Sequence, residues 1–196
     1  MDRKDFIKFS GSATAFTLFG GITWLFESCK KMEMKPTVIS VINGNFDNPL
    51  RLLAILDGTS IINFVAKKNS TSIIKGKTSY VLGYDGGILA PIIKVNNGQA
   101  VSINFTNQLE EITNVHWHGL IIPENMDGHP KYLVQPGSSF NYQFTINQKA
   151  GTNWFHPHPH LITGRQVFKG LAGMFIVNDA EEASLNLPSG EFELPL

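Results

Sequence analysis

Short stretches of alternating apolar and polar residues characterise this chain from about residue 51 onward. Residues 100–107 show the pattern most clearly, because Val101, Ile103 and Phe105 fall on one face of a strand. β-Branched and aromatic residues enrich the other stretches, and no window shows a sustained helical period. The predicted strands cover residues 59–67, 71–74, 78–82, 92–95, 100–107, 112–118, 139–146, 152–155 and 171–177.

Frequent turn signals separate these predicted strands. The chain contains 18 glycines and 10 prolines, which is typical of short strands joined by turns. We see no domain boundary between residues 51 and 180, so we predict one all-β domain, an antiparallel sandwich or barrel. The tail, residues 181–196, ends in an apolar run, and we expect it to begin the connection to a further domain that this chain lacks.

Residues 1–29 have the composition of an export signal. Arg3 and Lys4 lie near the start, and an uncharged stretch rich in apolar and small residues runs from residue 9 to residue 26. A transmembrane anchor is the alternative, but the many small polar residues make this stretch a poor membrane span. Residues 3–8 resemble the twin-arginine export motif, with Lys4 in place of the second arginine. Residues 30–50 are rich in turn-forming residues and are predicted to be a linker.

Cys29 is the single cysteine, which excludes an internal disulfide framework and any multi-cysteine metal site. Residues 25–29 resemble a lipobox, and a lipidated Cys29 would attach the protein to a membrane. A stray cysteine near a cleavage site is the alternative. In both cases the leader predicts an exported protein of the periplasm or cell envelope.

The charge balance excludes one class of partner. The 16 basic and 16 acidic residues give a formal net charge of zero, so nothing electrostatic indicates nucleic acid as a partner. Hydrophobic residues make up 42% of the chain and charged residues 16%, and this composition indicates a globular fold rather than disorder.

The six histidines all lie in one quarter of the chain. Four of them form two His-x-His pairs, His116 with His118 and His156 with His158. Since side chains at positions i and i+2 of a strand share a face, two such strands laid side by side would gather four imidazoles. Pro157 has no backbone N–H to donate, so its strand must end or lie at a sheet edge there.

Imidazole is a ligand for copper, zinc, iron and nickel. A set of imidazole ligands without a thiolate favours copper over structural zinc, and zinc stays open as the alternative. A lone histidine on a strand is more often a surface or hydrogen-bonded core residue, but two clustered pairs favour a metal site. His129 lies in a turn-like stretch and is expected to face solvent from a loop. His160 follows Pro159 and is expected to be a loop residue or to orient a ligand, with ligation as the alternative.

At these histidines the chain resembles the multicopper oxidases, and within them the N-terminal cupredoxin (plastocyanin-like) domain of the bacterial copper-efflux oxidase and laccase-like branch. The resemblance covers roughly residues 50–196, and its motifs occur in the family's order. It implies a cupredoxin-like Greek-key β-sandwich. The motifs lie at residues 84–86, 89–91, 116–120, 127–128, 134–137, 151–158, 163–166 and 170–177.

The resemblance implies that four histidines supply half of the ligands of a trinuclear copper cluster. His116 matches the ligand of the type 2 copper. His118 and His156 match ligands of one type 3 copper, and His158 matches a ligand of the other. Asp127 matches an acidic position that helps to move protons to the oxygen being reduced, with an ordinary turn residue as the alternative.

The family's type 1 copper requires a cysteine thiolate, and this chain has no cysteine beyond residue 29. We therefore expect the type 1 copper and the other cluster ligands in a missing C-terminal cupredoxin domain. In the complete enzyme, the resemblance implies that a reducing substrate, cuprous ion or a phenol-type donor, is oxidised at the type 1 copper. Its electrons then pass to the cluster, which reduces dioxygen to water. This chain alone is expected to be inactive.

Two functions of other classes remain open on the sequence. The first is a stand-alone, non-catalytic copper-binding or copper-carrying module, in which the histidines hold metal without oxidase chemistry. The second is a metal-free β-sandwich that serves as an interaction domain of an exported protein. Copper binding by the histidines separates the second from the others.

Overall fold

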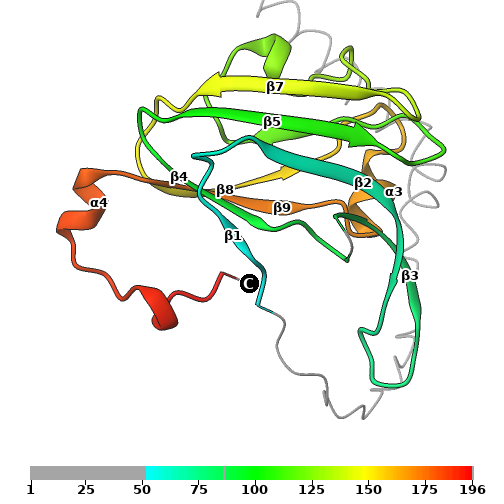
Figure 1. Ribbon diagram of the computed structural model, residues 1–196, viewed down its shortest axis with the longest axis horizontal. Helices are drawn as coiled ribbons and strands as arrows, with labels where there is room; N and C mark the ends of the chain where they lie inside the picture. Colours follow the sequence, from blue (N-terminus) through cyan, green and yellow to red (C-terminus); the bar gives the residue numbers. More distant parts are fainter. Residues whose placement is uncertain (1–51, 86, 196) are drawn as a thin grey trace, which may run out of the picture. The chain divides into compact units, whose positions relative to one another are not determined.

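The alternation of apolar and polar side chains gives each strand one face to bury, and two sheets bury these faces against each other (Figure 1). The computed structural model describes residues 52–85 and 87–195, and the predicted leader and linker lie outside them. One sheet has the strand order β1 (Ile55–Leu56), β4 (Ile92–Asn96), β9 (Gly173–Asn178), β8 (Gly151–His156) and β6 (His116–His118). The other has the order β3 (Ser79–Tyr84), β2 (Ile62–Thr71), β5 (Ala100–Asn107) and β7 (Ser139–Thr145).

Aromatic side chains fill the space between the two sheets. Trp117 of β6 packs edge-on against Tyr142 of β7, with ring centroids 5.4 Å apart. Phe155 of β8 stacks on Phe64 of β2 at 5.5 Å. Because each pair joins one sheet to the other, these contacts close the sandwich. The three alternating apolar residues predicted to share a face of the strand at residues 100–107 are all buried, which confirms that prediction.

The sheets are mixed rather than purely antiparallel, contrary to the sequence-based expectation. Strands β2 and β5 pair in parallel, as do β1 with β4 and β4 with β9. The chain crosses from one sheet to the other after β1, β3, β4, β5, β6 and β7, so neighbours in a sheet are seldom consecutive in sequence. Such Greek-key-like crossovers bring some neighbours together in the same direction. The predicted all-β, cupredoxin-like sandwich is confirmed.

Several predicted strand boundaries differ from the observed ones. No separate strand forms at residues 71–74, because β2 continues to Thr71 and a turn follows. Strand β6 contains only residues 116–118 of the predicted 112–118. The preceding segment makes an isolated bridge between Thr113 and Val134 instead of extending the ladder.

Two short helices occur where no helical pattern was predicted, α3 (Thr163–Phe168) and α4 (Ala180–Ser184). The N-cap of α4 is Asp179, whose carboxylate accepts the backbone N–H of Glu182 at 2.7 Å. Two single 3-10 turns, η1 (Glu124–Met126) and η2 (Gly190–Phe192), complete the elements. Across residues 52–85 and 87–195, none of the helices has the length and apolar character needed to cross a bilayer.

The tail predicted to begin a connection contains most of α4 together with η2. Glu193 near its end pairs with Lys94 of β4 at 2.6 Å. The tail therefore makes a contact with the first sheet as far as residue 193, and its role as a connection stays a prediction.

Two strand glycines on the paired strands β8 and β9 allow a test of the packing. A Cβ on Gly173 would lie 2.2 Å from Cζ of Phe155 and 2.7 Å from Cβ of Ala90, whereas one on Gly151 would meet no described atom within 4 Å. We expect Gly173→Ala to lower the free energy of unfolding by about 1–3 kcal/mol through overpacking. Urea unfolding of the purified chain measures this change.

Gly151→Ala is the matched control, since it adds the same methyl group to an extended glycine of the same strand pair. It should leave the unfolding free energy unchanged or raise it by less than about 1 kcal/mol. Equal losses in the two variants would show that the Phe155 contact does not limit the residue at position 173.

Candidate metal centre

Strands β6 and β8 bring the two histidine motifs together. They pair antiparallel, with His116 opposite His156 and Trp117 opposite Phe155. Trp117 and Phe155 are fully buried in the core, so the histidines at alternate positions project to the other face. This confirms that His116 and His118 lie on a strand beside that of His156, and that the second strand ends at His156, directly before Pro157. His158 lies beyond this strand, contrary to the expectation that both members of the second pair lie on it.

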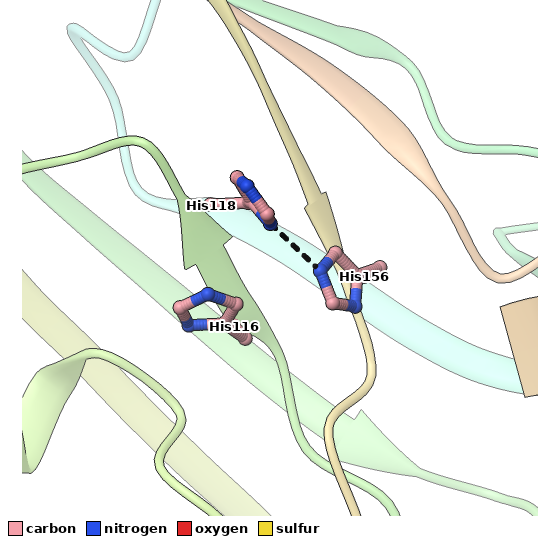
Figure 2. A group of neighbouring side chains, drawn as sticks. All are labelled: His116, His118 and His156. Carbon is pink, nitrogen blue, oxygen red and sulfur yellow. Dashed lines mark hydrogen bonds between the residues drawn. The ribbon is translucent and has the colours of Figure 1, made fainter. Parts of the chain in front are cut away.

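Three of these histidines form a cluster of ring nitrogens. One nitrogen each from His116, His118 and His156 lies within 4.8 Å of the others. Nδ1 of His118 and Nε2 of His156 face each other at 3.3 Å (Figure 2). Two nitrogens bound to one metal at about 2.0–2.1 Å and at a tetrahedral angle lie roughly 3.3–3.4 Å apart. The pair is therefore spaced as two ligands of one ion would be.

Backbone carbonyl groups orient two of the rings. Nδ1 of His116 lies 2.7 Å from the carbonyl oxygen of Asp127, and Nδ1 of His156 lies 2.9 Å from that of Pro157. A carbonyl oxygen only accepts hydrogen bonds, so each Nδ1 must carry the proton. The neutral ring then leaves Nε2 with a free lone pair, and such a fixed tautomer is typical of metal-binding histidines.

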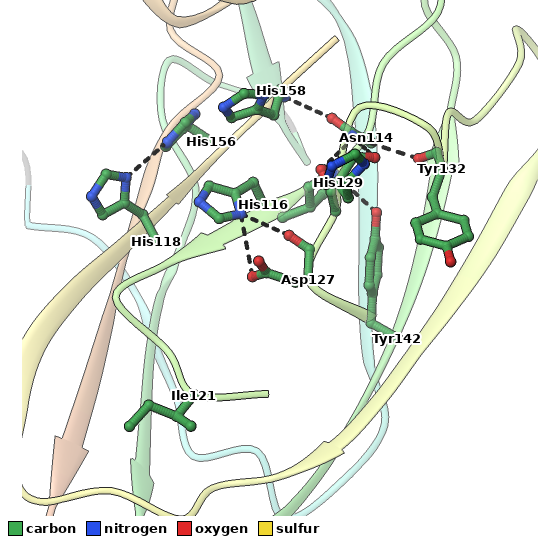
Figure 3. A network of polar contacts seen from close by, with 12 residues as sticks. Asn114, His116, His118, Ile121, Asp127, His129, Tyr132, Tyr142, His156 and His158 are labelled. Atoms are coloured by element: carbon green, nitrogen blue, oxygen red, sulfur yellow. Dashed lines mark hydrogen bonds and ion pairs between the residues drawn. The ribbon is translucent and has the colours of Figure 1, made fainter. Parts of the chain in front are cut away.

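Asp127 lies beside His116 at the end of η1 (Figure 3). Its Oδ1 atom is 3.2 Å from Nδ1 of His116, although the backbone carbonyl of the same residue is the closer partner. Burial raises the pKa of the Asp127 carboxyl group, and the neighbouring His116 opposes this rise. The carboxylate thus contacts the ring on the nitrogen that the tautomer leaves unavailable to metal.

His158 joins the group from beyond the end of β8. Its ring centroid lies 5.3 Å from that of His116 and 5.9 Å from that of His156. It is not one of the three residues whose nitrogens lie within 4.8 Å of one another. Its Nδ1 atom is buried and has no hydrogen-bond partner in the part of the chain that the structure describes. The structure therefore gathers four imidazoles, three of them tightly.

The other two histidines lie outside this group. His129 is exposed on the loop after η1, where its Nδ1 accepts the backbone N–H of Lys131 at 3.2 Å. His160 is exposed after Pro159. Both positions agree with the expectation that these are loop residues.

Burial also affects the charge of the cluster. Loss of hydration lowers the pKa of His156, and the neighbouring imidazoles lower it further because they disfavour a second positive charge. A histidine binds metal through its neutral ring, so this shift keeps His156 in the ligating form.

Two further residues contact the histidine group, Trp154, which the sequence indicates as a packing residue, and Asn114, which was not singled out from the sequence. The indole of Trp154 stacks on His156 with ring centroids 4.2 Å apart, and on His118 at 5.1 Å. Trp154 stands two residues before His156 on the same strand, so strand alternation places both side chains on one face. Asn114, two residues before His116, is fully buried and accepts the backbone N–H of His158 at 2.7 Å.

The donor set fits a copper centre. It consists of three imidazoles on paired strands, with no thiolate among them and with one carboxylate that touches Nδ1 of His116. Imidazole nitrogen is a good ligand for copper, and buried nitrogens without protons are the form in which it binds. The residues present are therefore suited to the metal that the sequence predicts.

Comparisons with known proteins agree with this chemistry. The family model described as multicopper oxidase matches residues 65–182. The multicopper oxidase mco of Staphylococcus aureus is 38% identical over 131 residues, which cover 67% of this chain and 29% of that protein. A multi-copper oxidase from Pediococcus acidilactici has a TM-score of 0.68 at 37% identity, over 72% of this chain and 32% of that chain. A laccase-like multi-copper oxidase from Ochrobactrum sp. has a TM-score of 0.69 at 32% identity, with the same coverage.

The family-model match extends over most of the described residues and includes both histidine motifs. The chain spans about 29% of the length of the curated relative and 32% of each of the two solved chains. The predicted copper cofactor is confirmed at the level of the family, whose name and chemistry rest on this metal. In sequence and in fold, the chain belongs to the multicopper oxidase family.

Proposed function

We propose that this chain supplies half of the histidine ligands of a trinuclear copper cluster. In this proposal His116 binds the type 2 copper, His118 and His156 bind one type 3 copper, and His158 binds the other. The observation that carries it is the pairing of β6 with β8, which places the facing nitrogens of His118 and His156 at 3.3 Å within the three-histidine cluster.

The surrounding residues have orienting roles in this proposal. The carbonyl groups of Asp127 and Pro157 hold the rings of His116 and His156 with the proton on Nδ1 and Nε2 unprotonated. Trp154 stacks on two of the rings and limits their rotation. When bound, copper supplies the one-electron chemistry by which dioxygen is reduced. The carboxyl group of Asp127, whose pKa burial raises, is suited to hold and release a proton next to His116.

We further propose that this domain acts within an assembly that contains another cupredoxin domain. That domain would provide the remaining cluster ligands and the type 1 copper, at which cuprous ion or a phenol-type donor is oxidised. The proposal is supported by the relatives, of whose length this chain spans less than a third. The reaction class is oxidation of a donor with dioxygen as acceptor.

Export is part of the proposal and rests on the leader, which lies outside the described residues. The basic start and the uncharged stretch up to residue 26 support transport to the periplasm or cell envelope. Lipidation of Cys29 would then hold the protein at the membrane.

Copper titration of the purified chain tests the ligand assignment. We expect tight Cu(II) binding without an intense blue band, because residues 52–85 and 87–195, which include all the histidines, contain no cysteine. His116→Ala and His156→Ala should each weaken binding by more than about 100-fold, since even residues that only orient a ligand are worth 10–100-fold. Competition with a chelator of known affinity measures the change.

His129→Ala and His160→Ala are the matched controls, because both rings are exposed outside the cluster. They should bind copper like the unsubstituted chain. A chain that binds no copper would instead be a metal-free interaction domain, and a strong blue colour would contradict the assignment. The non-catalytic copper-carrying module would be favoured if the chain binds copper while neither the rest of its gene nor a partner chain supplies a His-Cys-His segment.

The acid stability of the metal-free chain tests the environment of His156. Its folded pKa is lowered by burial, whereas the unfolded ring titrates near its ordinary value of about 6.5. As the pH falls through that value, the unfolded chain takes up a proton that the folded chain refuses, so stability is lost on acidification. One such group contributes a slope of at most about 1.4 kcal/mol per pH unit. The unfolding free energy, measured with urea between pH 7 and pH 5, should therefore depend less steeply on pH in His156→Gln than in the unsubstituted chain.

His160→Gln is the control for this experiment, because it makes the same change at an exposed ring. It should keep the slope of the unsubstituted chain. Asp127 contributes in the opposite sense, because burial raises the pKa of its carboxyl group, and this contribution is common to the unsubstituted chain and both variants. An unchanged slope in His156→Gln would show that the buried ring is not the source of acid sensitivity.

A further inference from the structure

We propose that Asn114 is a positioning residue for the metal centre, because its side chain ties together the three segments that carry His116, Asp127 and His158. This inference rests on the proposed copper site, which it deepens. Asn114 lies two residues before His116 and is completely buried, so its amide must find its partners inside the protein. Figure 3 shows this amide between the histidine group and the loop that follows η1.

The oxygen of the Asn114 amide holds the segment of His158. Oδ1 accepts the backbone N–H of His158 at 2.7 Å. His158 stands between Pro157 and Pro159, which have no N–H, so it has the only backbone donor among these three residues. The strand β8 has already ended at His156. Asn114 therefore takes the one main-chain donor by which this part of the chain can be anchored beside β6.

The nitrogen of the same amide holds the loop of Asp127. Nδ2 donates to the carbonyl oxygen of Gly128 at 2.7 Å and lies 3.4 Å from those of His129 and Tyr132. Gly128 has φ +67°, and a Cβ there would lie 2.0 Å from the carbonyl oxygen of Val115, so the loop lies directly on the backbone before β6.

This loop contact reaches the metal centre through one peptide. The residue that precedes Gly128 is Asp127, whose carbonyl oxygen receives the Nδ1–H of His116. By fixing Gly128, Asn114 thus fixes the acceptor that selects the tautomer of His116. One buried amide thereby places the backbone of His158 with its oxygen and the orienting carbonyl of His116 with its nitrogen.

The fold contains a second buried asparagine with the same bonding pattern. Nδ2 of Asn107 donates to the carbonyl oxygens of Glu111 and Val134, both at 2.9 Å, and its Oδ1 accepts the N–H of Leu109 at 2.9 Å. Asn107 is also completely buried, but it contacts no histidine in these bonds. It therefore serves as a matched control for the general cost of disturbing a buried amide.

The experiment compares Asn114→Asp and Asn114→Ala with Asn107→Asp and Asn107→Ala in the full chain. Metal-free protein is examined by nitrogen NMR of the histidine rings, which reports the tautomer, and by amide hydrogen exchange at His158. Copper affinity is then measured by Cu(II) titration. The midpoint temperature of thermal unfolding should fall by similar amounts for substitutions at the two positions, because the same kinds of hydrogen bond are lost.

Only the substitutions at position 114 should change the centre. Asn114→Asp keeps an acceptor for the His158 N–H but loses the donor to Gly128, so it should disturb the tautomer of His116 and leave the His158 amide protected. Asn114→Ala should disturb both the tautomer of His116 and the protection of the His158 amide. Each should weaken Cu(II) binding by about 10–100-fold, whereas the substitutions at position 107 should change it by less than about threefold.

Several results would overturn the proposal. In the first, the variants of position 114 lose as much stability as those of position 107, but the tautomer of His116 and the copper affinity stay unchanged. Another needs no variant: in the unsubstituted chain the His158 amide should exchange slowly, and exchange as fast as at the exposed His160 would refute the contact. If the metal-free signals respond as expected while no form binds copper, the proposed function fails and the positioning role of Asn114 stands.

Discussion

The register between β6 and β8 is the constraint on which the metal centre depends. A shift of one residue would exchange the two faces of β6, turning His116 and His118 into the core and Trp117 out of it. The pairing of Trp117 with Phe155 prevents such a shift, because both rings are fully buried and their centroids lie 5.2 Å apart. The geometry of the histidine cluster is thus set by apolar packing on the opposite face of the same strands.

The core in turn relies on its neighbours in both sheets. Phe155 occupies space that Gly173 on the adjacent strand leaves open, and it stacks on Phe64 of the second sheet. The hydroxyl group of Tyr142 accepts the backbone N–H of Val115 at 2.9 Å, directly before the first ligand strand. Aromatic packing and one buried hydrogen bond therefore link the second sheet to the histidines, although no residue of that sheet belongs to the cluster.

Local patterns in the sequence predicted the features that depend on alternation. They include β5 with its correct bounds, the shared face of His116 and His118, and the end of a strand before Pro157. Features that depend on distant contacts were not predictable. Helix α3 has no side-chain cap at its start and is held by Gln166, whose amide bonds to Thr113, Glu111 and the carbonyl group of Ile112. The parallel strand pairs likewise follow from the crossovers between sheets, which no short window of sequence encodes.

The prolines of the second histidine motif also affect the unfolded chain. His156 and His158 each precede a proline, and a residue in that position is sterically restricted to extended backbone conformations even without tertiary structure. The two prolines are themselves fixed in φ. This histidine segment therefore gives up less conformational entropy when it orders than a flexible loop of the same length would. Rigidity that a strand would otherwise supply is here built into the covalent structure, and it holds the second histidine pair in place at the point where the sheet has already ended.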